Sequence, residues 1–319
     1  MKLSTKDGKL VYSMDRGKIE KMLSLPLEEI LAIAGRVRRE GVGKALETCG
    51  IINAKSGTCG EDCKFCAQSG HYATSVEEYP LKSIEEIAQA ARRSKEEGSK
   101  RFGIVTSGKG LTDTEIKIIA DAIRRMTGEI DIIPCASLGA LNRESFTLLK
   151  EAGLVRYHHN IETSERFYPN IVSTHDYSER ISTIKDAKSC DLEVCSGGIF
   201  GLGESWRDRI DMACLLKELD VDSVPLNFLV PIEGTPLGGV RQLSPVEAIK
   251  IIALFRIVLP DKTIRVAAGR ESVLKDFQGM MYAAGANGMM VGGYLTVAGR
   301  GVEEDLALVE EIRALWNEE

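Results

Sequence analysis

The sequence lacks the features of membrane, secreted and nucleic-acid-binding proteins. No segment of its 319 residues approaches the eighteen or so uninterrupted apolar residues that a membrane span needs. The first residues, MKLSTKDGKLVYSMDRGKIEKML, carry charges throughout and contain no apolar signal-peptide core. No stretch is strongly basic, and 41 Lys and Arg against 47 Asp and Glu give a net charge of -6. We therefore expect a cytoplasmic protein that binds neither membrane nor nucleic acid and acts on a small molecule.

Internal repeats, long linkers and low-complexity tracts are also missing, which argues against an array of small domains. A chain of this length can form one large α/β domain. We predict a single domain over residues 1–319, with an N-terminal helical extension at 1–44, a barrel at 45–293 and a C-terminal helix at 294–319.

Short β-branched apolar runs alternate with amphipathic segments, as in repeated βα units. The eight runs are roughly 45–54, 101–106, 130–135, 155–161, 192–199, 223–229, 263–267 and 288–292. A helix at about 24–39 precedes them, and Ser83 with Glu86 and Thr112 with Glu115 form capping boxes before two later helices. The pattern predicts an α/β fold, a (β/α)8 TIM-type barrel, whose functional groups lie at the carboxyl ends of the strands.

Eight cysteines are present, and three of them form the tight cluster Cys59, Cys63 and Cys66 after the first strand. Without an export signal, such thiols serve metals or catalysis more often than disulfides. The spacing C-x3-C-x2-C can wrap one soft metal centre, either zinc or iron with sulfide. A structural zinc site needs a fourth ligand, and although His71 is near, the sequence has no second C-x2-C pair.

This cysteine spacing, with the aromatic Phe65 before the last cysteine, resembles the signature of the radical S-adenosylmethionine (SAM) superfamily. The resemblance implies that the three thiolates hold a 4Fe-4S cluster, that S-adenosyl-L-methionine binds its open iron, and that reductive cleavage gives a 5′-deoxyadenosyl radical. The protein then contributes orientation and exclusion of water, while the radical chemistry belongs to the cofactor. No side chain is expected to act as a catalytic acid, base or nucleophile.

Within the superfamily, the chain resembles the biotin synthase family from about residue 51 to residue 293. The motifs are CGEDCKFCAQSGHY, RYHHNIETSERFYPNIVSTHDYSERI, EVCSGGIFGLGES, DSVPLNFLVPIEGTPL, IRVAAGRES and AAGANGMMVGGY, in the order that the family has. The resemblance implies insertion of sulfur into dethiobiotin over two rounds of SAM cleavage, activity only without oxygen, a flavodoxin or ferredoxin as electron donor, and a homodimer.

By the same resemblance, the cofactor-binding residues are Phe65, Asn160, Glu162 and Ile199, and the substrate-binding residues are Lys55, Arg101, His158 and Asn227. The family often has Asn where His158 stands and Asp where Glu162 stands. From the residues alone, other interpretations stay open. The glycine-rich segment at Ile199 lacks GxGxxG spacing and could be a tight turn, Lys55 and Arg101 could be solvated surface charges, and His158 could be a structural donor.

The family keeps a second, auxiliary iron-sulfur cluster as its sulfur source. Cys135 and Cys195 match two of its cysteine ligands and Arg265 matches its arginine ligand, whereas Gly103 stands where the third cysteine usually lies. We predict that Cys49 compensates, so that Cys49, Cys135, Cys195 and Arg265 hold an auxiliary cluster whose nuclearity stays open. The alternative for each cysteine is a small residue of the hydrophobic core.

Two other functions must be weighed. A related radical SAM enzyme of the hydrogenase-maturation or methylornithine-synthase type would use the same barrel and cysteine loop on an amino-acid-like substrate. An electron carrier or metal-storage protein would hold clusters without cleaving SAM, and it would leave the pocket residues unexplained.

Overall fold

The computed structural model describes residues 4–6, 9–11, 15–293 and 300–318. Before the barrel, two short antiparallel strands are followed by two helices. They are β1 (Ser4–Lys6), β2 (Lys9–Val11), α1 (Arg16–Leu23) and α2 (Leu27–Val42). The expected helix at about 24–39 corresponds to α2, which starts after Pro26 because proline fits only the first turn of a helix. The hairpin of β1 and β2 was not expected from the helical pattern.

Parallel strands form a closed ring, which confirms the predicted barrel. In ring order they are β3 (Glu47–Lys55), β4 (Arg101–Thr106), β5 (Ile133–Ser137), β6 (Arg156–His158), β7 (Glu193–Cys195) with β8 (Gly198–Phe200), β9 (Ser223–Phe228), β10 (Thr263–Val266) and β11 (Gly288–Met290). Pairing of β11 with β3 and of β9 with β10 closes the ring, so the described part of the sheet has no free edge.

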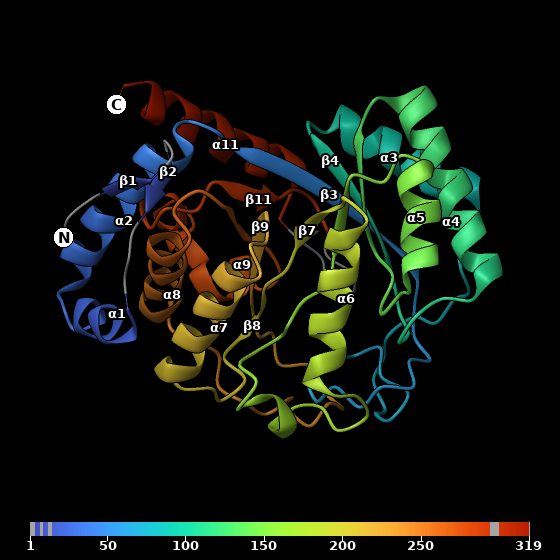
Figure 1. Cartoon of the computed structure of the whole chain (residues 1–319), viewed down its shortest axis with the longest axis horizontal. Coiled ribbons are helices and arrows are strands. Elements are labelled where there is room, and N and C mark those ends of the chain that lie inside the picture. The colour runs from blue at the N-terminus through green and yellow to red at the C-terminus, as the bar shows by residue number, and fades with distance from the viewer. Residues whose placement is uncertain (1–3, 7–8, 12–14, 294–299, 319) are drawn as a thin grey trace.

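Helices cover the outside of this ring, with α3, α4 and α5 on one side and α1, α2 and α8 on the opposite side (Figure 1). Their bounds are α3 (Ile84–Glu96), α4 (Asp113–Arg125), α5 (Arg143–Glu151), α6 (Tyr177–Ser189), α7 (Trp206–Glu218), α8 (Pro245–Val258), α9 (Arg270–Leu274), α10 (Met280–Ala283) and α11 (Val302–Asn317). Single turns lie at η1 (Met126–Ile130), η2 (Tyr168–Asn170) and η3 (Lys275–Phe277). Nearly all of α8 is buried because α2 packs against it on the side away from the barrel.

Local signals in the sequence are found where they were predicted. Both capping boxes form, since the Ser83 and Thr112 hydroxyls accept from the backbone of Glu86 and Glu115. Most strand boundaries lie within two residues of expectation, but three runs differ more. The fourth run, expected at 155–161, is only the three-residue strand β6. The third run begins at Ile133 rather than 130, because a π-helical turn extends α4 to Ile130. The fifth run is two strands, β7 and β8, separated by Ser196 and Gly197.

The ends of the chain pack outside the barrel. In α11, Asp305 forms a fully buried ion pair with Arg270, 2.8 Å apart, and Trp316 lies under the guanidinium of Arg38. Residues 294–299 and 319 of the predicted C-terminal helix lie outside the described residues. None of the described helices combines the length and apolar composition that crossing a bilayer requires.

Candidate active site

The cysteine loop follows β3 at the carboxyl end of the barrel. Cys59, Cys63 and Cys66 line one cavity of about 200 Å³, which we call the outer cavity. Its other lining residues include Glu61, Lys109, His159, Asn160, Glu162, His175, Glu179 and Arg180. Thr58, directly before the first cysteine, has a positive φ of 49°, and Gly70 N donates to Cys59 O at 2.7 Å. The loop is therefore a defined turn that brings three thiols to one polar cavity.

The outer cavity brings together three thiols, the ligand type that both zinc and iron-sulfur clusters use. Among the described residues, no group of three or more His, Cys, Asp or Glu side chains is arranged to hold one metal ion. Thiolates around one zinc ion, each about 2.3 Å from it, would lie about 3.8 Å apart, whereas a cluster of several irons spaces them more widely. Burial raises the pKa of the Cys63 and Cys66 thiols, so metal binding there would release protons.

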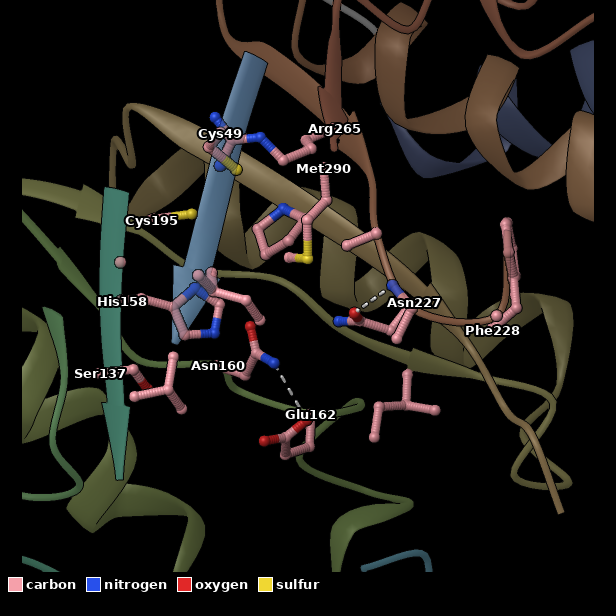
Figure 2. Close-up of a pocket in the computed structure, with 18 of the residues that line it drawn as sticks. Cys49, Ser137, His158, Asn160, Glu162, Cys195, Asn227, Phe228, Arg265 and Met290 are labelled. Carbon is pink, nitrogen blue, oxygen red and sulfur yellow. Dashed lines mark hydrogen bonds between the residues drawn. The ribbon is translucent and has the colours of Figure 1, made fainter. Parts of the chain in front are cut away.

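A second cavity of about 380 Å³, the inner cavity, extends from this site into the barrel. Phe65, Cys66, His158, Asn160 and Glu162 line both cavities. Much of the remaining inner wall is apolar, with Ile51, Val105, Ile199, Phe228, Leu229, Ile232, Ala267 and Met290. Figure 2 shows Cys49, Cys195 and Arg265 toward one end of this pocket and Asn160 and Glu162 toward the other.

Asn160 and Glu162 follow β6 and face the mouth of the inner cavity. The backbone of Glu162 is in the left-handed region, with φ of 66°. This conformation costs free energy in a residue other than glycine, and such backbone strain is often found at functional sites. Its carbonyl accepts from Ile199 N at 2.9 Å, and its carboxylate accepts from Asn160 Nδ2 at 3.4 Å. The Asn160 amide oxygen in turn accepts from Gly197 N at 3.1 Å. Two strand ends are thus fixed against each other around the pocket.

The glycine pair before Ile199 is required by packing. A Cβ placed on Gly197 would lie 1.9 Å from Pro225 O, and one on Gly198 would lie 2.1 Å from Glu162 O. Beyond them, the Glu204 carboxylate accepts from Gly201 N and Leu202 N, and it also accepts from Arg209 Nε at 2.8 Å. This buried carboxylate shapes the turn that holds Ile199 against the cavity.

Deeper in the barrel, Cys49, Cys135 and Cys195 come from β3, β5 and β7 and all line the inner cavity. Burial raises the pKa of Cys135 to about 12, although Arg156 and Arg101 oppose the shift. Burial also raises the pKa of Cys195, but a hydrogen bond from His158 and the charges of Arg265 and Arg156 outweigh it and bring that pKa to about 7. His158 and Cys195 are register partners on adjacent strands, so their side chains lie side by side on the inner face.

An ion-pair network forms the floor below these thiols. Glu47 accepts from Arg101 Nε at 2.6 Å and Arg156 Nη1 at 2.8 Å, and it also pairs with Arg265. Burial raises the pKa of Glu47, but the three guanidinium groups dominate and hold it at about 2. Among the described residues, Arg265 Nε is buried without a hydrogen-bond partner. One donor of Arg265 is therefore unused, and an anionic group such as a sulfide-rich cluster would satisfy it.

The predicted substrate-binding residues do not all meet at one place. His158 and Asn227 line the inner cavity, where Asn227 Nδ2 donates to Gly198 O and its Oδ1 accepts from Ala268 N, both at 3.1 Å. In the described structure neither Lys55 nor Arg101 lines it. Lys55 Nζ donates to Glu115 Oε1 at 2.7 Å, and Arg101 lies in the floor network.

Several lining residues of the outer cavity were missed by the sequence analysis, among them two that contact each other. Arg180 and His175 lie in the outer cavity beside the cysteine loop. They belong to the segment THDYSER that contributed to the resemblance, but nothing in its spacing marks either residue as part of a pocket.

Comparison with known proteins agrees with this geometry. Residues 54–216 match the model of the radical SAM superfamily, and residues 225–313 match that of the Biotin and Thiamin Synthesis associated domain. In fold, the chain is similar to methylornithine synthase, with a TM-score of 0.80 at 20% identity over 96% of both chains. It is also similar to the FeFe-hydrogenase maturase HydG from Carboxydothermus hydrogenoformans, with a TM-score of 0.79 at 18% identity over 93% of this chain and 74% of the other. At such identities these two structures show the fold alone.

Sequence relatives are more specific. The biotin synthase of Thermotoga petrophila is 49% identical over 93% of this chain and 99% of its own length. That of Thermotoga neapolitana is 53% identical over 85% of this chain and 97% of its own length, and that of Pelotomaculum thermopropionicum is 46% identical over 93% and 97%. With this degree of identity over nearly the whole chain, and with both family models matched, the chain belongs to the biotin synthase family of radical SAM enzymes.

Proposed function

We propose that this chain converts dethiobiotin to biotin by radical insertion of sulfur from an auxiliary iron-sulfur cluster. One observation carries the proposal: three thiols beyond those of the cysteine loop, Cys49, Cys135 and Cys195, line the cavity directly below the cofactor-binding residues. A second set of thiols within the substrate cavity suits an enzyme that transfers sulfur from an iron-sulfur cluster.

In the proposal, Cys59, Cys63 and Cys66 hold a 4Fe-4S cluster, and SAM occupies the mouth between the two cavities. When bound, these groups supply an electron and a 5′-deoxyadenosyl radical. The chain's own residues bind and orient the cofactor. Asn160 and Glu162 offer an amide and a carboxylate to its polar atoms, and Ile199 and Phe65 offer apolar surface to its rings.

We assign Cys49, Cys135, Cys195 and Arg265 to the auxiliary cluster. Their common lining of the inner cavity supports this, as does the unpartnered Nε of Arg265 among the described residues. Glu47 and its three arginines fix the floor, so the cysteines are held by strands that cannot shift independently. The cluster would supply sulfur, and its iron count is not part of the assignment.

Dethiobiotin would occupy the apolar part of the inner cavity, where the lining excludes water from the reacting carbons. Asn227 supports the substrate position because its amide is already oriented by Gly198 O and Ala268 N. His158 faces the same space. A role for Lys55 would require its ion pair with Glu115 to break, and Arg101 acts on the cavity through Glu47.

We further propose, from the resemblance, that a one-electron donor such as flavodoxin or ferredoxin serves the enzyme and that it functions as a cytoplasmic homodimer. The decisive assay is anaerobic. Protein reconstituted with iron and sulfide is reduced and supplied with SAM and dethiobiotin, and 5′-deoxyadenosine and biotin are followed by mass spectrometry.

Formation of both products is the expected result. Deoxyadenosine without biotin, from protein with a full set of auxiliary iron, would contradict the substrate assignment. Absence of both products from fully loaded protein would contradict the proposed function as a whole.

A further inference from the structure

A chain of polar contacts connects the cysteine loop with the cofactor-binding residues. Glu61, between Cys59 and Cys63, contacts the Nδ1 of His175 through Oε2. The Nε2 of His175 lies 3.0 Å from Arg180 Nη2. Arg180 Nη1 lies 3.6 Å from the Oε1 of Glu162. The segment that precedes α6 therefore joins the loop of cluster ligands to the far wall of the outer cavity.

The direction of these hydrogen bonds follows from what each group can donate. A guanidinium has donors only, so the Nε2 of His175 must accept from Arg180. The imidazole is then neutral with its proton on Nδ1, which donates to the Glu61 carboxylate. Burial and the charge of Arg180 lower the pKa of His175, which agrees with this tautomer.

Arg180 is held on its other sides as well. Its Nε donates to the Tyr168 hydroxyl at 2.7 Å, and its Nη1 donates to the Asn160 carbonyl at 3.0 Å. The side chain is 13% exposed. His175 provides the contact through which this fixed guanidinium reaches the cysteine loop.

Neighbours of His175 fasten the same part of the loop. Ser173 N donates to Asp62 Oδ1 at 2.8 Å, and Lys64 N donates to Ile171 O at 3.0 Å. His175 itself is 7% exposed and stands edge-on to Tyr168, with ring centroids 5.9 Å apart. An apolar side chain of similar size could fill the same space. It could not form the two polar contacts that connect Arg180 with Glu61.

We infer that His175 is a positioning residue that locks the cysteine loop to Arg180 and Glu162, so that the cluster ligands and the SAM-binding residues keep one relative geometry. The inference rests on the proposed function, because it assigns SAM to this site. Without the link, the loop keeps its contacts with residues 171–174 but loses its connection to Arg180, so the position of the cluster ligands relative to Glu162 is less closely fixed.

Two replacements of His175 separate positioning from packing. In His175→Gln, the amide oxygen can accept from Arg180 and the amide nitrogen can donate to Glu61. In His175→Leu, the volume is kept and both polar contacts are lost. We expect the Leu variant to bind SAM about tenfold or more weakly, as for loss of a hydrogen bond to a charged group, and the Gln variant to stay within about threefold.

A spectroscopic measurement accompanies the affinity. SAM changes the electron paramagnetic resonance spectrum of a reduced cluster when it binds the open iron, and the Leu variant should show a smaller change at saturating SAM than the wild type or the Gln variant. The control is Arg166→Gln. Arg166 lies in the same connecting segment as His175 and forms a 2.7 Å ion pair with the buried Asp208, but it lines neither cavity. Its SAM affinity should equal that of the wild type.

A Leu variant with full iron content, unchanged SAM affinity and an unchanged spectrum would overturn the inference. If that variant does not retain the cluster, Glu61→Leu removes the acceptor at the other end of the same link and should weaken SAM binding in the same direction. Unchanged affinity in a loaded Glu61→Leu protein would overturn the inference equally. A wild-type protein that neither binds SAM nor forms 5′-deoxyadenosine would instead refute the proposed function, so the two failures are distinguishable.

Discussion

Cys49 and Gly103 lie on the neighbouring strands β3 and β4, and both line the inner cavity. A Cβ placed on Gly103 would come no closer to another residue than 3.2 Å, from the Cγ2 of Ile51, so a cysteine fits there after a small shift. We predict that Cys49→Ala lowers auxiliary iron while the SAM cluster stays loaded, and that adding Gly103→Cys in the same chain restores much of it. Mössbauer spectra and iron and sulfide analysis measure both effects.

Cys190→Ala is the matched control for this pair, because Cys190 ends α6 and lines neither cavity. It should keep the full iron content. Unchanged auxiliary iron in Cys49→Ala would refute the assignment of Cys49 as a ligand.

Lys55 gives a second test at the level of single side chains. Its ammonium group is paired with Glu115, which also forms the capping box of α4. We predict that Lys55→Met leaves the KM for dethiobiotin within about threefold and costs about 1 kcal/mol or less of stability, as for other partly exposed ion pairs. A steady-state assay and a thermal melt measure the two quantities. A tenfold rise in KM would instead show that Lys55 leaves Glu115 to contact the substrate.

At the scale of elements, the junction of β7 and β8 depends on the absence of side chains. Gly198→Ala would place a methyl group 2.1 Å from Glu162 O and 2.7 Å from Met212 Cε. The carbonyl belongs to the left-handed residue at the cofactor pocket, so the strain is transmitted to the site. We predict a loss of about 1–3 kcal/mol of stability, as for overpacking, together with weaker SAM binding. Denaturant unfolding and SAM titration measure these losses.

Gly239→Ala is the control for this substitution. No atom lies within 4 Å of the Cβ it would gain, and its φ is not in the positive range. Both stability and SAM affinity should be unchanged. Equal behaviour of the two alanine variants would mean that the strand junction tolerates a side chain.

Elements with local signals could be predicted from the sequence, and those set by neighbours could not. The capping boxes at Ser83 and Thr112 need only residues three positions apart. The division of strand five, by contrast, arises because Gly197 packs on Pro225, a residue of β9. The π-helical end of α4 has no comparable cue, since Met126–Ile130 continues the amphipathic pattern of the helix.

The candidate site divides in the same way. The spacing of Cys59, Cys63 and Cys66 is a local pattern, so a metal centre there could be predicted from the residues alone. The second set of thiols comes from three strands, and only the family resemblance brought them together in advance. The contact of His175 with Glu61 joins residues 114 positions apart, and no periodicity or spacing indicates such a pair.

At the scale of the whole molecule, backbone pairing between neighbouring strands closes the barrel. Strand β3 pairs with β4 on one side and β11 on the other, and β9 pairs with β10. The aliphatic core between the sheet and the helices includes Ile104, Ile119, Ile184, Ile252 and Val266, each fully buried. The proposed clusters occupy the two cavities instead, so they are held by the fold and do not replace part of its core.

This arrangement predicts how the protein responds to loss of its metal. Removal of iron by a chelator under reducing conditions should leave the far-ultraviolet circular dichroism nearly unchanged and should retain one cooperative thermal transition. The transition temperature should fall, because groups that bind only the folded state stabilise it by mass action, and reconstitution with iron and sulfide should restore it. The transition temperature of the Cys49→Ala variant should fall less on chelation, since this variant has less metal to lose. A broad, non-cooperative melt of the metal-free protein would contradict the prediction, because it would mean that the strands carrying the thiols need the clusters in order to stay paired.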